Sequence, residues 1–203
     1  MTTPGKTIGI LGGSFNPVHI GHVMLASYLT QFTSLDSVWL TLSPLNPLKA
    51  NSSELIPDVQ RLNMLAIATK NAPGIEICDI ELSMPRPSYT INTLDFLCKK
   101  YPGRQFKLII GSDNWKIFEQ WRDYRRIIDQ YGVIVYPRPG YPLPSLYEDG
   151  VDVIDAPVFN ISSTFVRRAV AKGFDMTFFL PSGVFDYIKK NRLYGYNEPF
   201  INE

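Results

Sequence analysis

Short apolar runs alternate along the chain with segments in which apolar residues recur every three or four positions. Runs rich in Val, Ile and Leu are typical of buried strands, whereas the longer period is typical of helices that pack on one side. The pattern predicts strands at residues 7–11, 38–42, 75–78, 106–110, 133–136 and 151–155. It predicts helices at residues 22–32, 59–70, 91–101, 124–130, 163–172 and 183–191, with a shorter helical stretch from Asn114.

Strands and helices that alternate in this way form βαβ units, which join by right-handed crossovers into a mostly parallel sheet. The expected fold is therefore a Rossmann-like α/β sandwich of three layers. Ligands of such folds bind outside the carboxyl ends of the strands, so candidate chemistry is expected in the loops that follow strands. No linker or repeat divides the chain, and one domain spanning residues 1–203 is expected. The Pro- and Gly-rich segment 137–144 is the best candidate for a lid or an insertion.

The composition is 45% hydrophobic and 19% charged over 203 residues, which excludes a disordered, collagen-like or coiled-coil chain. The 20 Lys and Arg balance the 19 Asp and Glu, so no general charge attracts nucleic acid or a membrane surface. Cys78 and Cys98 lack the spacing of a metal site or a disulfide framework, and no export signal or membrane-length apolar run occurs. These features predict a cytoplasmic protein that binds neither nucleic acid nor membrane, and they leave monomer or homo-oligomer open.

Both histidines of the chain lie in the loop between the first predicted strand and the first predicted helix. His19 and His22 are three residues apart, so they share one side of a helix that begins near His19. Gly12 and Gly13 let the backbone approach a ligand closely, and the amides at the start of the helix attract an anion. The combination predicts a phosphate cradle that carries two imidazoles. The alternative is that one histidine caps the helix and the other lies in the core.

The same loop matches neither the dinucleotide-binding pattern nor the P-loop pattern, which removes the main support for hydride transfer and for P-loop hydrolysis. A second candidate phosphate site lies at the start of the helix predicted at residues 163–172. Arg167 lies four residues after Ser163 and shares its face, so a hydroxyl, helix amides and a guanidinium can converge on one polyphosphate. The simpler alternative is that Ser162 and Ser163 only cap the helix.

Three segments of the chain resemble motifs of known nucleotidyltransferases. Residues 12–22, GGSFNPVHIGH, resemble the GxFxPxHxGH signature of the nucleotidyltransferase superfamily, and residues 161–167, ISSTFVR, resemble its ISSTxxR motif. Residues 87–94, PSYTINTL, are similar to the PSYTxxTL segment of bacterial nicotinate-nucleotide adenylyltransferases. The similarity continues through residues 110–113 and Trp121, and it covers essentially the whole chain, which is identified as a member of that family.

The resemblance implies transfer of the adenylyl group of ATP, accompanied by Mg²⁺, to nicotinate mononucleotide, with C-terminal helices from about residue 162 completing the ATP site. The residues expected to act on the reacting phosphates as cationic hydrogen-bond donors are His19, His22, Lys49 and Arg167. The expected ATP contacts are Gly12, Gly13, Ser14, Phe15, Gly111, Asp113, Ile161, Ser162 and Ser163. The expected contacts to nicotinate mononucleotide are Asn16, Ser88, Tyr89, Thr90, Trp121 and Arg138. The pyridine ring is expected to stack on Trp121, and backbone amides near Thr90 are expected to hold its carboxylate.

Two positions depart from the family pattern. Leu48 stands where the family usually has a histidine, which puts the contact of that histidine in doubt, and Asn16 stands where many relatives have aspartate. Three alternatives stay open: an adenylyltransferase for nicotinamide mononucleotide or phosphopantetheine, a noncatalytic nucleotide-binding module, and a synthetase-like protein that binds RNA. The basic residues Arg122, Arg125 and Arg126 are expected to form a solvated face without a function.

Overall fold

The computed structural model describes residues 5–44, 55–144 and 149–197. In this part of the chain six strands form one sheet in the order β3-β2-β1-β4-β5-β6, and every neighbouring pair is parallel. The strands are β1 (Thr7–Gly13), β2 (Ser37–Leu42), β3 (Ile75–Cys78), β4 (Gln105–Gly111), β5 (Val133–Tyr136) and β6 (Val151–Val153). The helices are α1 (Ile20–Phe32), α2 (Asp58–Thr69), α3 (Thr90–Lys100), α4 (Ser112–Trp115), α5 (Tyr124–Tyr131), α6 (Ser163–Ala171) and α7 (Val184–Lys190). The predicted Rossmann-like fold is confirmed, with a sheet that is wholly parallel.

The predicted strands and helices are all present, and their ends differ from the prediction by no more than two residues. β6 ends at Val153, where its pairing with the short strand β5 stops. The 3₁₀ turns at Ile80–Ser83, Phe118–Gln120 and Leu193–Gly195 are not predicted by the pattern. Such turns are too short to show a hydrophobic period.

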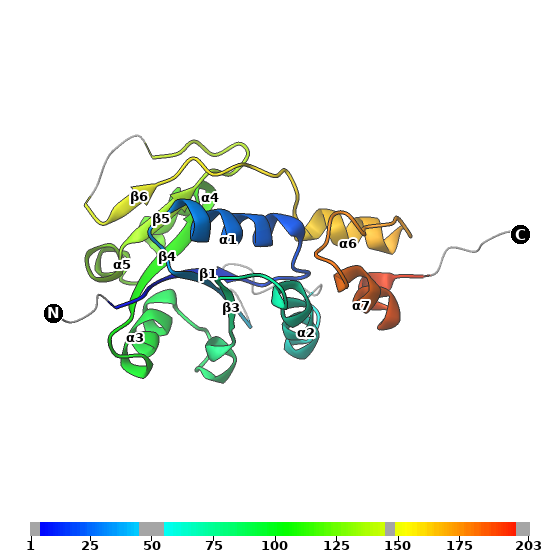
Figure 1. Ribbon diagram of the computed structural model, residues 1–203, viewed down its shortest axis with the longest axis horizontal. Helices are drawn as coiled ribbons and strands as arrows, with labels where there is room; N and C mark the ends of the chain where they lie inside the picture. Colours follow the sequence, from blue (N-terminus) through cyan, green and yellow to red (C-terminus); the bar gives the residue numbers. More distant parts are fainter. Residues whose placement is uncertain (1–4, 45–54, 145–148, 198–203) are drawn as a thin grey trace, which may run out of the picture.

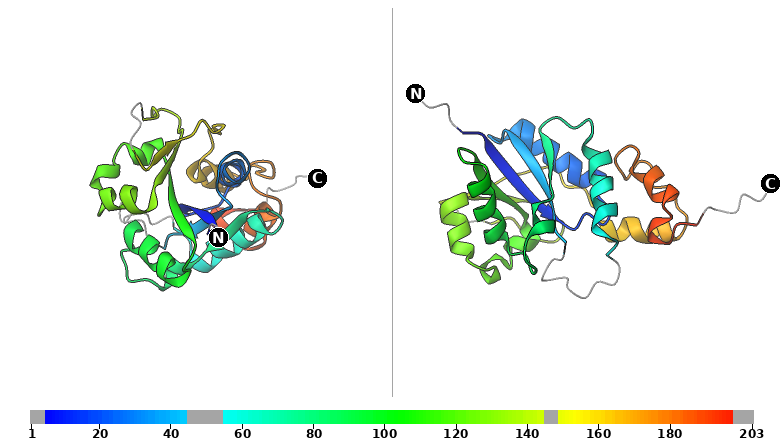
Figure 2. Two further views of the ribbon diagram at one scale, coloured as in Figure 1. Left: turned by 60° about the vertical axis from the view of Figure 1, so that its left-hand side comes forward. Right: turned by 90° about the horizontal axis from the view of Figure 1, so that it is seen from below.

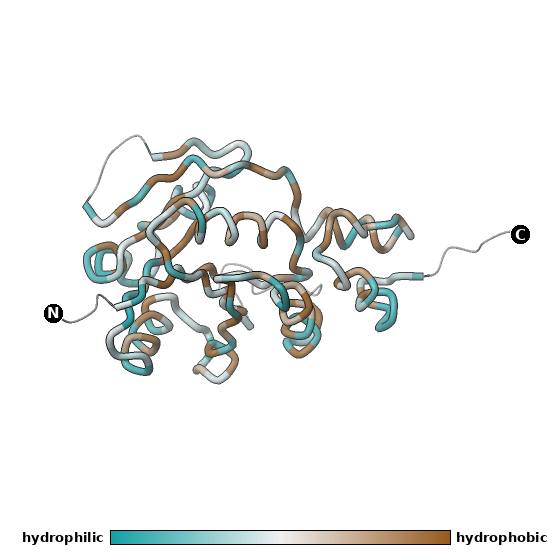
Figure 3. The backbone as a smooth tube through the Cα atoms, in the orientation of Figure 1, coloured by the Kyte–Doolittle hydropathy of each residue, from teal (hydrophilic) through white to brown (hydrophobic). Residues whose placement is uncertain are grey.

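The sheet separates two apolar cores, because successive side chains of a strand point to opposite faces. One core joins Leu11 of β1 to Leu29 of α1 and Met64 of α2, and it extends to α6 and α7. The other core joins Ile10 of β1 to Leu94 of α3, and it extends to α5. Figures 1 and 2 show helices on both sides of the sheet, and Figure 3 shows hydrophobic residues concentrated in the strands. Each fully buried Leu or Met contributes about 2 kcal/mol relative to an exposed one.

The order of the strands reverses at β1, which pairs with β2 on one side and with β4 on the other. Helices α6 and α7 lie beyond the sheet, next to the start of α1 (Figure 1). Open parallel sheets bind ligands at such a switch point, so the loop after β1 is the centre of the candidate site.

The Pro- and Gly-rich segment is held against the start of α4. Ser112 is buried there, accepts a hydrogen bond from the Arg138 amide at 3.0 Å and donates one to the Tyr141 carbonyl at 2.9 Å. A role of this segment as a lid stays a prediction. Within the described ranges, no helix combines the length and the hydropathy that a membrane crossing requires.

Candidate active site

The loop between β1 and α1 is shaped by glycine and by one residue in the left-handed region. Phe15 has φ 43°, and its buried ring lies under Gly13, where an added Cβ would be 3.0 Å from the ring. At Gly12 an added Cβ would meet no atom within 4 Å. The backbone at Gly12 is therefore open to a ligand. The Phe15 ring supports the loop from the inside, and the expected contact of Phe15 with ATP stays a prediction.

His19 and His22 lie against each other at the start of α1. Their ring centroids are 3.7 Å apart with planes inclined by 25°, and the His19 amide donates to Nδ1 of His22 at 3.1 Å. The prediction that both imidazoles share one side of the helix is confirmed. His19 also occupies the position that precedes the first turn, so a capping role and a role in the site are compatible.

The surroundings of both imidazoles favour the uncharged form. Burial and, to a smaller extent, Arg138 lower the pKa of His19 to about 4. Burial, the neighbouring His19 and Arg138 hold the pKa of His22 well below its usual range. The expectation that the histidines act as cationic donors on bound phosphates stays a prediction. A phosphate bound beside them raises both pKa values, because an opposite charge favours the protonated form.

The start of α6 is bonded directly to the loop that precedes the histidines. The Ser163 hydroxyl donates to the Pro17 carbonyl at 2.8 Å, and the Arg167 guanidinium donates to the Asn16 carbonyl at 2.9 Å. The prediction that Ser163 and Arg167 share one face of the helix is confirmed. Ser162 accepts a hydrogen bond from an amide of its own helix at 3.2 Å, so it is the cap that the simpler alternative predicts.

Segments from both ends of the chain meet at Asn16. This residue is buried, and its side-chain oxygen accepts a hydrogen bond from the Tyr194 hydroxyl at 3.0 Å. Burial raises the pKa of Tyr194 above its usual range, so the phenol keeps the proton that it donates. Ile161 packs against Gly21, where an added Cβ would lie 3.0 Å from the Ile161 side chain. These contacts fix the C-terminal helices against the first loop.

Asp113 and Arg138 close over Gly111 at the carboxyl end of β4. The Arg138 Nε lies 3.8 Å from the Asp113 Oδ1, and a Cβ added to Gly111 would overlap that oxygen and lie 2.6 Å from the Arg138 Cγ. Because Gly111 has no side chain, the side chains of Asp113 and Arg138 can lie directly against its backbone. The positive charge of Arg138 also lowers the pKa of both histidines.

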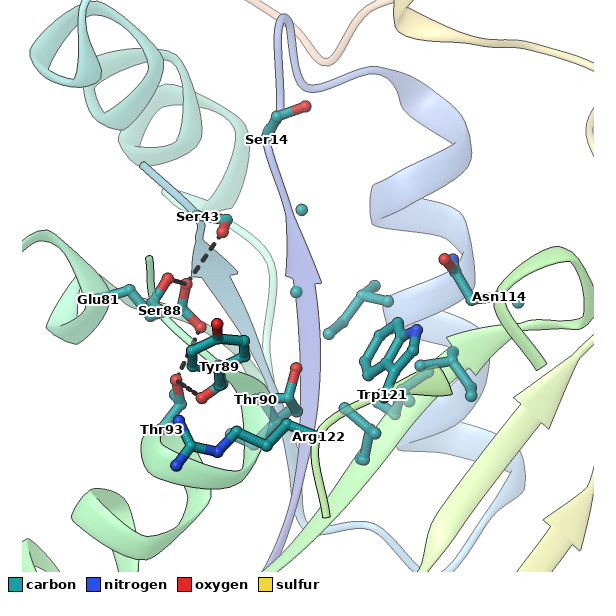
Figure 4. Close-up of a pocket in the computed structure, with 18 of the residues that line it drawn as sticks. Ser14, Ser43, Glu81, Ser88, Tyr89, Thr90, Thr93, Asn114, Trp121 and Arg122 are labelled. Atoms are coloured by element: carbon teal, nitrogen blue, oxygen red, sulfur yellow. Dashed lines mark hydrogen bonds between the residues drawn. The ribbon is translucent and has the colours of Figure 1, made fainter. Parts of the chain in front are cut away.

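A pocket of about 210 Å³ opens on the α3 side of the glycine loop (Figure 4). It lies between the carboxyl ends of β1 and β4, the start of α3 and the turn that follows Phe118–Gln120. The site residues that line it are Ser88, Tyr89, Thr90 and Trp121, together with Gly12, Gly13, Ser14 and Gly111. Asn16 and Arg138, expected beside Trp121, are not among its lining residues. Lys49 and Leu48 fall outside the described residues.

The pocket has one end that attracts anions and one aromatic wall. Helix α3 begins at Thr90 and no side chain caps it. The Asn92 and Thr93 amides donate to the Tyr89 carbonyl, so the amides that precede them are the ones available to a ligand. The Trp121 ring packs on Phe118 with centroids 5.3 Å apart. Its buried Nε1 has no hydrogen-bond partner among the described residues. A flat ring that carries a carboxylate suits both features.

Arg122 lines the same pocket, and its side chain is 58% exposed, as the expected solvated face predicts. Its guanidinium lies 5.0 Å from the centre of the Tyr89 ring. Arg125, by contrast, lies over Tyr124 at 5.3 Å and does not line the pocket. The position of Arg122 directly after Trp121 is the sequence signal that separates it from the other arginines.

Two charged side chains, Arg61 and the pocket-lining Glu81, are buried, and neither is predicted from the sequence. Arg61 is fully buried, and Glu81 is 8% exposed. Arg61 lies three residues before Met64, on the buried face of α2. A charged residue at a position where the helical period requires an apolar one is the sequence feature that indicates a buried charge. Glu81 lies in a 3₁₀ turn, which has no comparable period.

Three features define a nucleotide-binding domain of the nucleotidyl-transferring class. They are the order of the strands, the β1–α1 loop that leads to His19 and His22, and the hydrogen bonds from the start of α6 to that loop. Residues 10–169 match the family model described as cytidylyltransferase-like, so the chain belongs to the cytidylyltransferase-like family. It is similar to proteins named "Probable nicotinate-nucleotide adenylyltransferase". The one from Bacteroides fragilis is 48% identical over 181 residues, covering 89% of this chain and 90% of the relative. The one from Bacteroides thetaiotaomicron is 46% identical over 183 residues, covering 90% of each.

The fold is also that of a solved relative. Plasmodium falciparum nicotinic acid mononucleotide adenylyltransferase complexed with NaAD superposes with a TM-score of 0.76 at 21% identity, covering 95% of this chain and 98% of that one. Within its family, the chain is a member of the nicotinate-nucleotide adenylyltransferase group, as its motifs predict.

Proposed function

We propose that this protein transfers the adenylyl group of ATP to nicotinate mononucleotide, forming deamido-NAD and pyrophosphate in NAD biosynthesis. One observation carries the proposal: the pocket beside Trp121 and the start of α3 and the pair of histidines lie on either side of the same glycine loop. A nucleotide whose ring occupies the pocket directs its phosphate toward Gly12 and Ser14. The names of the relatives support this substrate.

The reaction requires no nucleophile from the protein. An oxygen of the mononucleotide phosphate attacks the α-phosphorus of ATP, and the bond from that phosphorus to the oxygen bridging to the β-phosphate breaks. Pyrophosphate leaves with the electron pair of that bond. The protein holds two anions in line and supplies hydrogen-bond donors where charge accumulates, which are the main sources of rate in phosphoryl transfer.

His19 is the first candidate for the contact to the α-phosphate. It is buried at the start of a helix, and its Nδ1 has no hydrogen-bond partner among the described residues. Arg138 lowers the pKa of both histidines and is not among the residues that line the pocket, so we assign it to the phosphates in place of the pyridine nucleotide. The other candidate contacts to the reacting phosphates are His22, Lys49, Ser162, Ser163 and Arg167. Asp113 is the candidate for a ribose of ATP.

Mg²⁺ belongs to this proposal as part of the MgATP substrate. In residues 5–44, 55–144 and 149–197, no three His, Cys, Asp or Glu side chains lie together as a metal site. In the proposed complex, phosphate oxygens and water hold the cation, and the cation neutralises part of the triphosphate charge.

The proposal includes one domain over residues 1–203, with the helices from about residue 162 completing the ATP site. The bonds of Ser163 and Arg167 to the first loop support that division of roles. A cytoplasmic location and the lack of binding to nucleic acid or membrane stay predictions.

The test is pyrophosphate release from MgATP in the presence of nicotinate mononucleotide, nicotinamide mononucleotide or phosphopantetheine. We expect kcat/KM to favour nicotinate mononucleotide by tenfold or more, which is about 1.4 kcal/mol at the transition state. A preference for either other substrate identifies that alternative instead. Release with none of the three contradicts the adenylyl acceptor proposed here.

A further inference from the structure

A chain of hydrogen bonds joins the glycine loop to one wall of the pocket. Figure 4 shows the part of this chain that runs from Ser43 through Glu81 to Ser88 and Thr93. The buried Arg61 donates from one nitrogen to two backbone carbonyls, Ser14 at 2.6 Å and Ser43 at 2.9 Å. Ser14 follows β1 and Ser43 follows β2, so this guanidinium joins the carboxyl ends of two neighbouring strands. Because Arg61 bonds the backbone carbonyl of Ser43, the Ser43 hydroxyl can form hydrogen bonds on the side of the pocket.

The chain continues through a buried carboxylate. Glu81 Oε2 accepts hydrogen bonds from the hydroxyls of Ser43 and Ser88, each at 3.0 Å, and its Oε1 accepts one from the Thr93 hydroxyl at 2.9 Å. Ser88 precedes the start of α3, and Thr93 lies in its first turn. The wall is therefore continuous from the phosphate end of the pocket to the start of α3.

The carboxylate determines which way the three hydroxyls point. An ionised carboxylate only accepts hydrogen bonds, so each hydroxyl must donate its single proton to Glu81. Ser43 and Ser88 line the pocket with the lone pairs that remain. On this wall the protein accordingly offers hydrogen-bond acceptors, and a ligand must supply the donors.

The negative charge of Glu81 also disfavours anionic groups of a ligand at this wall. In the described parts of the chain, no lysine or arginine forms an ion pair with it. An uncompensated carboxylate repels a phosphate or a second carboxylate. The anionic ends of a pyridine mononucleotide suit Ser14 and the glycine loop on one side and the start of α3 at Thr90 on the other. Figure 4 shows Ser43 and Ser88 between these two ends.

We infer that Ser43 and Ser88 accept hydrogen bonds from the ribose hydroxyls of the pyridine mononucleotide. Glu81 is the positioning residue that turns both serine hydroxyls into acceptors. The ribose lies between the phosphate and the ring, and it supplies the uncharged donors that this wall requires. The inference rests on the proposed function, since it assigns a part of the same substrate to the same pocket.

The test compares nicotinate mononucleotide with its 2′-deoxy and 3′-deoxy analogues in pyrophosphate release. In the unaltered protein, removal of the bonded hydroxyl is expected to lower kcat/KM about tenfold, as for the loss of one hydrogen bond that leaves a buried partner. In Ser43→Ala or Ser88→Ala that penalty should shrink to within about twofold for the hydroxyl concerned. The KM for MgATP should stay within about twofold, because neither Ser43 nor Ser88 is assigned to ATP.

Glu81→Gln tests the positioning role. The amide must donate one N–H to a hydroxyl, which turns the proton of that hydroxyl toward the pocket, so the deoxy penalty is expected to shrink without a loss of folding. Ser83→Ala is the matched control, because the Ser83 hydroxyl bonds the Ile80 carbonyl of the same 3₁₀ turn at 2.9 Å and lies outside the pocket lining. It should keep the full penalty.

Two results would overturn the inference. One is that the unaltered protein uses both deoxy analogues as well as the ribonucleotide. The other is that the penalty stays unchanged in Ser43→Ala and Ser88→Ala, which would leave Glu81 a purely structural role. Thermal unfolding of each variant identifies those that fold, and the two serine variants decide the question if Glu81→Gln does not. Failure of the proposed function is distinct, because then even the unaltered protein releases no pyrophosphate with nicotinate mononucleotide.

Discussion

The substitution Gly12→Ala is expected to separate stability from activity. Gly12 follows Ile10 by two residues in β1, so its missing side chain belongs to the face of the sheet that carries the pocket. An added Cβ would meet no atom of the described residues within 4 Å, and Gly12 has no positive φ that would strain alanine. The new methyl group would therefore project into the pocket without disturbing the fold.

The expected magnitudes follow from this geometry. Alanine in place of a glycine whose conformation it tolerates stabilises a protein by about 0.4–1 kcal/mol, chiefly by restricting the unfolded chain. For a domain of roughly this size, 1 kcal/mol shifts Tm by about 2–4 °C, so a rise of about 1–4 °C is expected. In the pocket the methyl takes the place of substrate. Overpacking costs about 1–3 kcal/mol, which corresponds to a loss of about 5- to 150-fold in kcat/KM.

The assay combines thermal unfolding with pyrophosphate release, and Gly111→Ala is the matched comparison. There an added Cβ would overlap Asp113 and lie 2.6 Å from the Arg138 side chain, so Tm and activity should fall together. Normal kcat/KM in Gly12→Ala would refute the placement of substrate over Gly12. A Tm several degrees below that of the unaltered protein would refute the steric argument.

Three further outcomes are expected. Arg122→Gln should raise the KM for nicotinate mononucleotide about five- to tenfold without changing the KM for MgATP, because it removes a positive charge from the pocket; Arg125→Gln is the control, and equal effects would contradict the reasoning. Tyr194→Phe deletes the hydrogen bond to Asn16 and should lower the free energy of unfolding by about 1 kcal/mol in urea titrations, whereas an unchanged value would show that this bond is not stabilising. Burial lowers the pKa of His19 to about 4 in the folded protein, from 6.5 in the unfolded chain. The contribution of uncharged His19 to the free energy of unfolding is therefore complete above pH 6.5, and about 3 kcal/mol of it is lost as the pH falls toward 4. His19→Gln should flatten this part of the plot of unfolding free energy against pH.

Local geometry explains which features of this protein are predictable from its sequence. The strands and helices follow from the period of apolar residues, since that period is the repeat of the secondary structure itself. His19 and His22 stack because a three-residue spacing places them on one side of α1, and Ser163 and Arg167 share a face of α6 for the same reason. The motifs therefore locate the phosphate side of the site.

The sequence by itself determined the elements, their alternation and the motif residues, whereas the tertiary structure decided the partners of individual side chains. Packing left Asn16 and Arg138 outside the lining of the pocket, and it placed Arg122 within that lining. It also buried Glu81 among hydroxyls that lie 38, 7 and 12 residues away along the chain. The charge of the histidines depends on burial as well. These properties depend on distances between elements that are remote in sequence, and no local pattern of residues encodes such distances.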